Sequence, residues 1–124
     1  MKTVLVVEDS RAAFEILRHE LAADGRYSAE YYCHNGENLL ELYEQHHPDI
    51  VAMDIIMPEA NGIDLTRALV QAHPEARVVM VTSMSYQEIR DSAEEAGAVG
   101  YVQKPYHPEQ VISAFDQALA AGRA

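Results

Sequence analysis

The run Ile50-Val51-Ala52-Met53-Asp54-Ile55-Ile56-Met57-Pro58 decides the fold. Its first four residues are all apolar, which predicts a strand buried on both faces, and Asp54 follows directly at the end of that strand. The acidic pair Glu8-Asp9 follows another apolar strand, residues 4–7, in the same manner. Acids crowded together in this way indicate a metal ion, a proton or a nucleophilic step rather than a contribution to stability.

Short apolar strands and segments of helical period alternate along the rest of the chain. We predict strands at 4–7, 27–33, 50–53, 77–82 and 97–103, and helices at 10–23, from the Asn35-Gly36 turn to about 46, after Gly62, at about 86–96 and from Pro108. Parallel strands covered by helices must be apolar throughout, and the crossovers between them are right-handed. The chain is therefore predicted to be α/β, a three-layer α/β/α sandwich around a five-stranded parallel sheet.

Apolar periodicity also predicts which side chains face the core. In the first helix the expected buried face is Ala13, Ile16, Leu17 and Leu21, with Phe14 at its edge. The second helix carries Leu39, Leu40, Leu42 and Tyr43. Residues 58–62 are predicted to form a loop. The histidines lack ligand spacing and are expected at the surface: His19, His34, His46, His47, His73 and His107.

Length and charge restrict the classes of function. A chain of 124 residues has room for one core, so we expect a single domain over residues 1–124. The formal net charge of −11 argues against direct nucleic-acid binding, whose affinity depends on cationic side chains. We see no membrane segment and no signal peptide, and therefore expect a cytoplasmic protein. The single cysteine, Cys33, cannot form an internal disulfide and is expected to be buried.

Reactive side chains follow four of the predicted strands. In an open parallel sheet, ligands bind in the crevice at the carboxyl ends of the strands. The residues at those ends are Glu8-Asp9, Asp54, Thr82-Ser83 and Lys104-Pro105. We therefore expect three acids, a hydroxyl and an amine to meet at one edge of the sheet.

These motifs resemble, in order and spacing, the receiver domains of response regulators in two-component signalling, and chemotaxis regulators in particular. The resemblance covers residues 4–120 and rests on Glu8-Asp9, Asp54-Ile55-Ile56-Met57-Pro58 with Asn61-Gly62, Val81-Thr82-Ser83 and Tyr101-Val102-Gln103-Lys104-Pro105. It implies a flavodoxin-like fold with strand order 2-1-3-4-5. It also implies a cis peptide bond between Lys104 and Pro105.

The chemistry that these residues suggest is phosphoryl transfer to a carboxylate. Asp54 is the expected nucleophile and phosphorylation site, a role open to aspartate in covalent catalysis. Mg²⁺, for which Mn²⁺ could substitute, is expected on the all-oxygen set Glu8, Asp9, Asp54 and the backbone carbonyl of Ile56. Lys104 and Thr82 are placed to stabilise the transferring group. The resemblance implies that the donor is a phosphohistidine on a histidine kinase or a histidine phosphotransfer protein.

The resemblance also implies a switch. A phosphate on Asp54 is expected to draw the Thr82 hydroxyl inward and to leave space into which Tyr101 rotates, shifting an existing equilibrium. The output face is expected around Tyr86, Ile89, Arg90, Tyr101 and the last helix, where an output partner or a second copy of the chain binds. Ala12, Ala13 and Phe14 lie where receivers meet their kinases, and a kinase contact and core packing are the two explanations for them.

Two apolar residues occupy the positions that flank the attacking water in receivers. Ile56 and Met84 are bulky, and neither side chain can orient that water. We therefore expect slow self-dephosphorylation.

Other functions are open at this point. An aspartate-nucleophile phosphohydrolase is disfavoured because it needs a second acid two residues after Asp54, where Ile56 stands. A receiver-like module that only binds proteins predicts loss of part of the pocket, yet Glu8, Asp9, Asp54, Thr82 and Lys104 are all present. Strand-end polar residues can also cap the helix that follows, as Asp9 or Ser10 could.

Overall fold

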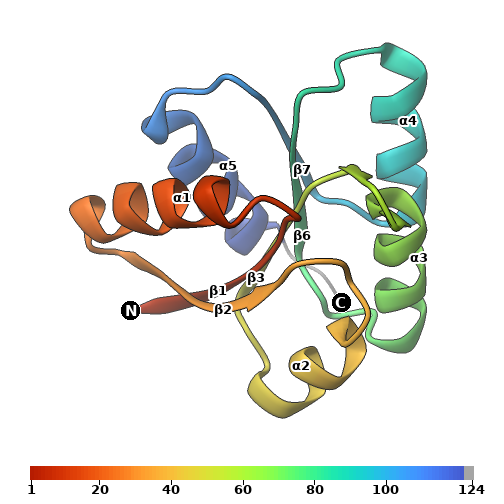
Figure 1. The fold of residues 1–124 in the computed structure, drawn as a ribbon, viewed down its shortest axis with the longest axis horizontal. Coiled ribbons are helices and arrows are strands. Elements are labelled where there is room, and N and C mark those ends of the chain that lie inside the picture. The colour runs from red at the N-terminus through yellow and green to blue at the C-terminus, as the bar shows by residue number, and fades with distance from the viewer. Residues whose placement is uncertain (122–124) are drawn as a thin grey trace.

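The computed structural model describes residues 1–121, and the last three residues of the predicted domain, 122–124, lie outside the described residues. One sheet forms the centre of the molecule (Figure 1). Its parallel strands are β1 (Lys2–Val7), β2 (Tyr27–Cys33), β3 (Ile50–Met53), β6 (Val78–Thr82) and β7 (Gly100–Gln103). They lie in the order β2-β1-β3-β6-β7. This arrangement confirms the predicted five-stranded sheet and its 2-1-3-4-5 order.

Helices cover both faces of the sheet, as Figure 1 shows. One core cluster joins the sheet to α1 (Arg11–Asp24) and α5 (Pro108–Ala120). The other joins it to α2 (Leu39–His46), α3 (Gly62–Ala72) and α4 (Gln87–Ala96). The four residues of β3 are at most 2% exposed because both clusters cover this central strand. The predicted three-layer sandwich is confirmed.

Helix α1 shows how local sequence sets an element boundary. The Ser10 side chain accepts a hydrogen bond from the Ala13 N–H (3.1 Å), so Ser10 caps the helix that follows the acidic pair. The helix ends at Gly25, which has a φ of 87° and donates its N–H to the Leu21 carbonyl (3.0 Å). Ser10 therefore has a structural role, whereas the acids before it do not cap the helix.

The predicted buried face of α1 is confirmed at Leu17 and Leu21 and wrong at Ile16. Ile16 is 58% exposed, whereas Phe14 is 5% exposed and its ring stacks on Tyr32 with centroids 4.4 Å apart. The buried residues Phe14, Leu17 and Leu21 follow an i, i+3, i+7 pattern, so the buried face lies on the Phe14 side of Leu17 rather than on the Ile16 side. Phe14 therefore lies in the core, whereas Ala12, also named for the kinase contact, is exposed.

The predicted loop at 58–62 was wrong in part, because Ala60–Asn61 form the second strand of a small antiparallel hairpin. Strand β4 (Ile56–Met57) pairs with β5 (Ala60–Asn61). Gly62 follows the hairpin, where a Cβ atom would meet the Asp54 carbonyl oxygen and the Ile55 backbone. Only glycine allows this close approach, and it brings the start of α3 against the backbone of Asp54.

The burial of Cys33, Leu40 and two histidines can be compared with what the sequence predicts. Cys33 is buried, as expected, and Leu40 is 40% exposed although its neighbour Leu39 is in the core. His46 and His73 are half-buried rather than exposed, because His46 stacks on Tyr31 and His73 lies between Glu44 and Glu75. Within residues 1–121, none of the helices has the length and apolar composition that a membrane span requires.

Candidate functional site

Asp54 lies at the carboxyl end of β3. Its backbone N–H and both of its carboxylate oxygens form hydrogen bonds. Its N–H donates to the Val7 carbonyl on the neighbouring strand (2.9 Å). Its Oδ1 accepts from the Ile56 N–H (3.2 Å), and its Oδ2 accepts from the Lys104 Nζ (3.4 Å). The carboxylate is buried but not isolated. A buried, oriented carboxylate with a cationic neighbour suits a nucleophile.

Glu8 and Lys104 form the tightest pair of the site. Lys104 Nζ lies 2.5 Å from Glu8 Oε1, and the second Glu8 oxygen accepts from the Ser10 N–H (3.2 Å). Lys104 follows the last residue of β7, and its peptide bond to Pro105 is cis, as the resemblance implied. Its ammonium therefore bridges the acids of β1 and β3, as Lys104 is also within 3.4 Å of Asp54.

Burial and charge act in opposite directions on this pair. Burial raises the pKa of Glu8, and the neighbouring Asp54 charge adds to the rise, while the hydrogen bond from Lys104 opposes it. For Lys104, burial lowers the pKa, but the hydrogen bond to Glu8 and the charge of Asp54 outweigh burial and raise it. The site therefore keeps its amine protonated and holds an acid that gains from a further cation.

One cluster of acids, here called the acidic pocket, fits a divalent ion. It consists of Glu8, Asp9 and Asp54. Each offers one carboxylate oxygen, and these oxygens lie within 4.8 Å of one another. Oxygen ligands of this kind are those that Mg²⁺ prefers. Asp9 is exposed and Glu8 and Asp54 are buried, so the pocket is open on one side. The structure thus brings together the three acids predicted from the strand ends.

Thr82 and Tyr101 are connected through Met84. Thr82 is fully buried, and its hydroxyl accepts a long hydrogen bond from the Met84 N–H (3.4 Å). The Tyr101 hydroxyl donates to the Met84 carbonyl (2.7 Å), and the Arg90 guanidinium lies 4.4 Å from the centre of the Tyr101 ring. Sequence reasoning named Met84 only for its bulk, whereas its backbone joins the two residues expected to form the switch.

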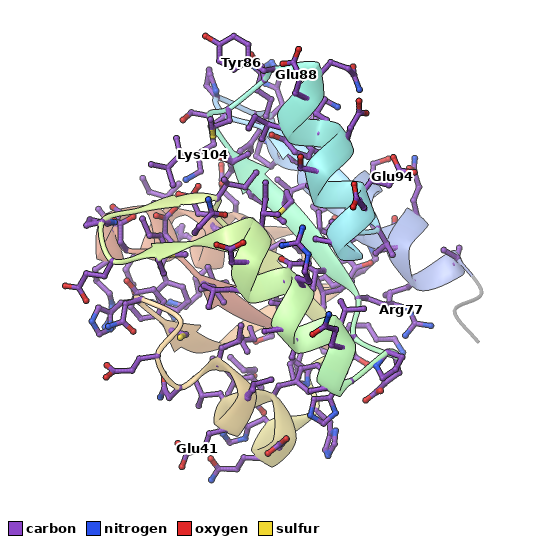
Figure 2. The ribbon with its side chains drawn as sticks, turned by 90° about the vertical axis from the view of Figure 1, so that its right-hand side faces the viewer. Glu41, Arg77, Tyr86, Glu88, Glu94 and Lys104 are labelled. Atoms are coloured by element: carbon purple, nitrogen blue, oxygen red, sulfur yellow. The ribbon has the colours of Figure 1, made fainter. Side chains whose placement is uncertain are left out.

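The two predicted water-flanking residues lie at the rim of the pocket. Ile56 is 53% exposed, and its N–H is bonded to Asp54 Oδ1. Met84 is half-buried in the β6–α4 loop. Of the predicted output face, Tyr86 is 69% exposed and Ile89 and Arg90 are half-buried. Figure 2 shows Tyr86 and Lys104 toward the same end of the molecule.

An apolar cavity of about 310 Å³ adjoins the acidic pocket, and sequence reasoning missed it. It lies between α1 and the loop that joins β7 to α5. Its apolar lining includes Leu17, Ala52 and Val81, while Glu8, Asp54 and Lys104 also contribute to its wall. A cavity depends on how distant segments pack, so no local pattern in the sequence could reveal it.

The chain is similar to known proteins over nearly all of its length. The model of the response regulator receiver domain family matches residues 4–116. The chemotaxis protein CheY of Halobacterium salinarum is 35% identical over 120 residues, which covers 97% of this chain and 98% of that protein. CheY of Thermotoga maritima is 33% identical over 116 residues, covering 94% and 96%.

A solved structure is similar over the full length. It is a two-component response regulator of the LuxR family from Aurantimonas sp. SI85-9A1, with a TM-score of 0.92 and 30% identity. The similarity covers 100% of this chain and 89% of that chain.

Proposed function

Because the chain belongs to the family of response regulator receiver domains, we propose that it accepts a phosphoryl group on Asp54 in two-component signalling. The observation that carries this proposal is the meeting of three acids and one amine. Lys104 Nζ lies 2.5 Å from Glu8 and 3.4 Å from Asp54, beside the cluster of Glu8, Asp9 and Asp54. We propose that the site belongs to a single receiver domain that acts in the cytoplasm.

The reaction is a displacement at phosphorus. An Asp54 carboxylate oxygen attacks the phosphoryl group of a phosphohistidine, and a phosphorus–oxygen bond forms as the phosphorus–nitrogen bond breaks. The imidazole nitrogen keeps the electron pair, takes a proton from solvent and leaves as neutral imidazole. The donor belongs to a histidine kinase or a histidine phosphotransfer protein, and the product is an aspartyl phosphate.

The residues of the pocket hold and balance the charge. Glu8, Asp9, Asp54 and the backbone carbonyl of Ile56 would hold Mg²⁺, or Mn²⁺ in its place, which neutralises the acids and the phosphoryl oxygens when bound. The Lys104 ammonium contributes a second positive charge next to Asp54. The Thr82 hydroxyl donates to a phosphoryl oxygen once it leaves Met84.

The same step operates the switch. The Thr82 hydroxyl bonds the Met84 N–H, and Met84 accepts from Tyr101, so a Thr82 drawn toward a phosphate loosens the support of Tyr101. The release of Tyr101 shifts the equilibrium between two alternative packings of α4 and β7. The signal leaves through the face of α4, β7 and α5, to an output partner or to a second copy of the chain.

Intact-mass measurement tests the proposal. The chain is incubated with Mg²⁺ and acetyl phosphate, a small donor that needs no kinase, and we expect a mass gain of one phosphoryl group. The gain disappears in Asp54→Asn and when the metal is removed with EDTA. A wild-type chain that takes up no phosphate would overturn the proposal.

A further inference from the structure

A hydrogen bond ties the lysine-bearing loop to helix α1. Tyr106 stands two residues after Lys104 in the β7–α5 loop, and its hydroxyl donates to Glu20 Oε1 on α1 (2.8 Å). Burial raises the pKa of Tyr106, and the Glu20 hydrogen bond adds to the rise. The hydroxyl therefore stays protonated and remains the donor throughout the physiological range.

Both residues of this hydrogen bond line the cavity beside the acidic pocket. The cavity of about 310 Å³ separates α1 from the β7–α5 loop, with Glu8, Asp54 and Lys104 among its lining residues and with Glu20 and Tyr106 among the others. Side chains that face an open space have no packing partner on that side. They therefore lack the contacts that would fix the distance between the loop and α1. Apolar packing alone therefore holds this loop less firmly against α1 than it holds the strands.

Two hydrogen bonds fix the segment 104–106 of the loop, one at each end. The Lys104 N–H donates to the Thr82 carbonyl (2.8 Å), which fixes the segment to β6. The Tyr106 hydroxyl bonds to Glu20 and fixes the other end to α1, the helix that begins directly after Glu8-Asp9-Ser10. The bond thus links the lysine loop to the element that follows two of the acids.

We propose that Tyr106, through its hydrogen bond to Glu20, is a positioning residue that holds the β7–α5 loop where the Lys104 ammonium meets both Glu8 and Asp54. The inference rests on the proposed role of Asp54 as phosphoryl acceptor. A lysine side chain is long and flexible, so its ammonium is placed well only when its backbone is held. Small displacements of a charged group at a reacting centre reduce the rate strongly.

The chain offers a matched control. The Tyr27 hydroxyl donates to Asp116 Oδ1 (2.5 Å), which links β2 to α5 through the same chemical pair. Tyr27 is not among the residues that line the cavity beside the pocket. Tyr27→Phe and Tyr106→Phe therefore remove the same kind of bond, one away from the site and one beside it.

The test is the rate of phosphorylation by acetyl phosphate with saturating Mg²⁺, followed by intact mass. We expect Tyr106→Phe and Glu20→Ala to slow transfer by about tenfold. Glu20→Gln keeps an oxygen acceptor and should restore a rate near that of the wild type. Tyr27→Phe should match the wild type.

A second background separates positioning from general destabilisation. In Lys104→Met there is no ammonium to place, so adding Tyr106→Phe should cause no further loss of rate. An equal additional loss in that background, or equal slowing by Tyr27→Phe, would overturn the inference. Glu20→Ala removes the same hydrogen bond by a change on α1. If Tyr106→Phe does not fold, Glu20→Ala provides the test in its place.

The outcome also separates this inference from the proposed function. If the wild-type chain takes no phosphate, the proposed function fails. If the wild type is phosphorylated and Tyr106→Phe reacts at the same rate, only the positioning role of Tyr106 is wrong.

Discussion

The Lys104 ammonium donates a 2.5 Å hydrogen bond to Glu8, although the two residues lie 96 positions apart in the chain. Glu8 is also one of the acids proposed to hold Mg²⁺. The lysine and the metal ion therefore compete for the same carboxylate, while both are needed for charge balance during transfer. This relationship makes opposite predictions for metal binding and for phosphorylation.

Replacing Lys104 should separate these two effects. In Lys104→Met the competing positive charge is gone, so we expect Mg²⁺ to bind about tenfold more tightly, as measured by titration calorimetry. Phosphoryl transfer should fall by about 100-fold, because a charge that stabilises the transferring group is lost. Lys2→Met, an exposed lysine on β1, is the control and should change neither quantity. Unchanged or weaker Mg²⁺ binding in Lys104→Met would show that the lysine does not compete.

Glu8 makes the stability of the protein depend on pH in an unusual direction. Burial raises its pKa above the ordinary value of 4.5, so the folded state binds the proton more tightly than the unfolded state. The stabilising contribution is therefore present below pH 4.5 and is lost as pH rises through the raised pKa. Glu8→Gln cannot titrate, so with EDTA its free energy of unfolding should rise relative to the wild type as the pH increases above 4.5.

Added Mg²⁺ should reverse the Glu8 comparison. A ligand that binds only the folded state stabilises it, and the wild type has the carboxylate that the variant lacks. Urea unfolding with and without Mg²⁺ measures both trends. A Glu8→Gln variant that gains as much from Mg²⁺ as the wild type would remove Glu8 from the metal site.

Ile56 and Met84 are expected to slow the loss of phosphate. Ile56 is 53% exposed, so Ile56→Asn should leave the fold intact and place an amide where water attacks. Together with Met84→Gln we expect dephosphorylation to be about tenfold faster, because a positioned polar group assists the attacking water. The decay of the phosphorylated mass after removal of the donor measures the rate. Leu40→Asn, at an exposed leucine on α2, is the control, and equal decay in all variants would contradict the role of the two positions.

Gly62 should be far less tolerant of a methyl group than Gly25. A Cβ at Gly62 would collide with the Asp54 carbonyl oxygen, so Gly62→Ala must displace backbone at the nucleophile. We expect a loss of about 3 kcal/mol in unfolding free energy, together with impaired phosphorylation. Gly25 has a φ of 87° and nothing within 4 Å of an added Cβ, so Gly25→Ala should cost only about 1 kcal/mol and leave transfer unchanged. Equal costs at the two positions would show that the approach to Asp54 is not tight.

Much of the fold and of the site could be predicted because the signals are local. The apolar run Ile50–Met53 must be buried on both faces whatever surrounds it, and its end places Asp54 at the sheet edge. The same reasoning placed Glu8, Thr82 and Lys104 at that edge. The strand order and the cis bond before Pro105 came from the resemblance to receivers and not from periodicity.

The errors have a common physical origin. The α1 face was misplaced because Phe14 and Ile16 are both apolar, and only the space beside Tyr32 decides which of them is buried. The β4–β5 hairpin was missed because its two short strands contain a proline between them and no alternating pattern. His73 was placed at the surface because its partner Glu44 lies on α2 and is identified only by the packing of α2 beside α3.

The sequence by itself determined the α/β class, the buried strands and the set of reactive residues at their ends, because each depends on neighbours within a few positions along the chain. Only the tertiary structure decided which of these residues pair: Lys104 with Glu8, Tyr101 with the Met84 carbonyl, and Tyr106 with Glu20. Such pairs join segments 17 to 96 positions apart, and their geometry depends on how helices seat on the sheet. That seating also leaves the cavity beside the pocket, a space that no run of residues encodes.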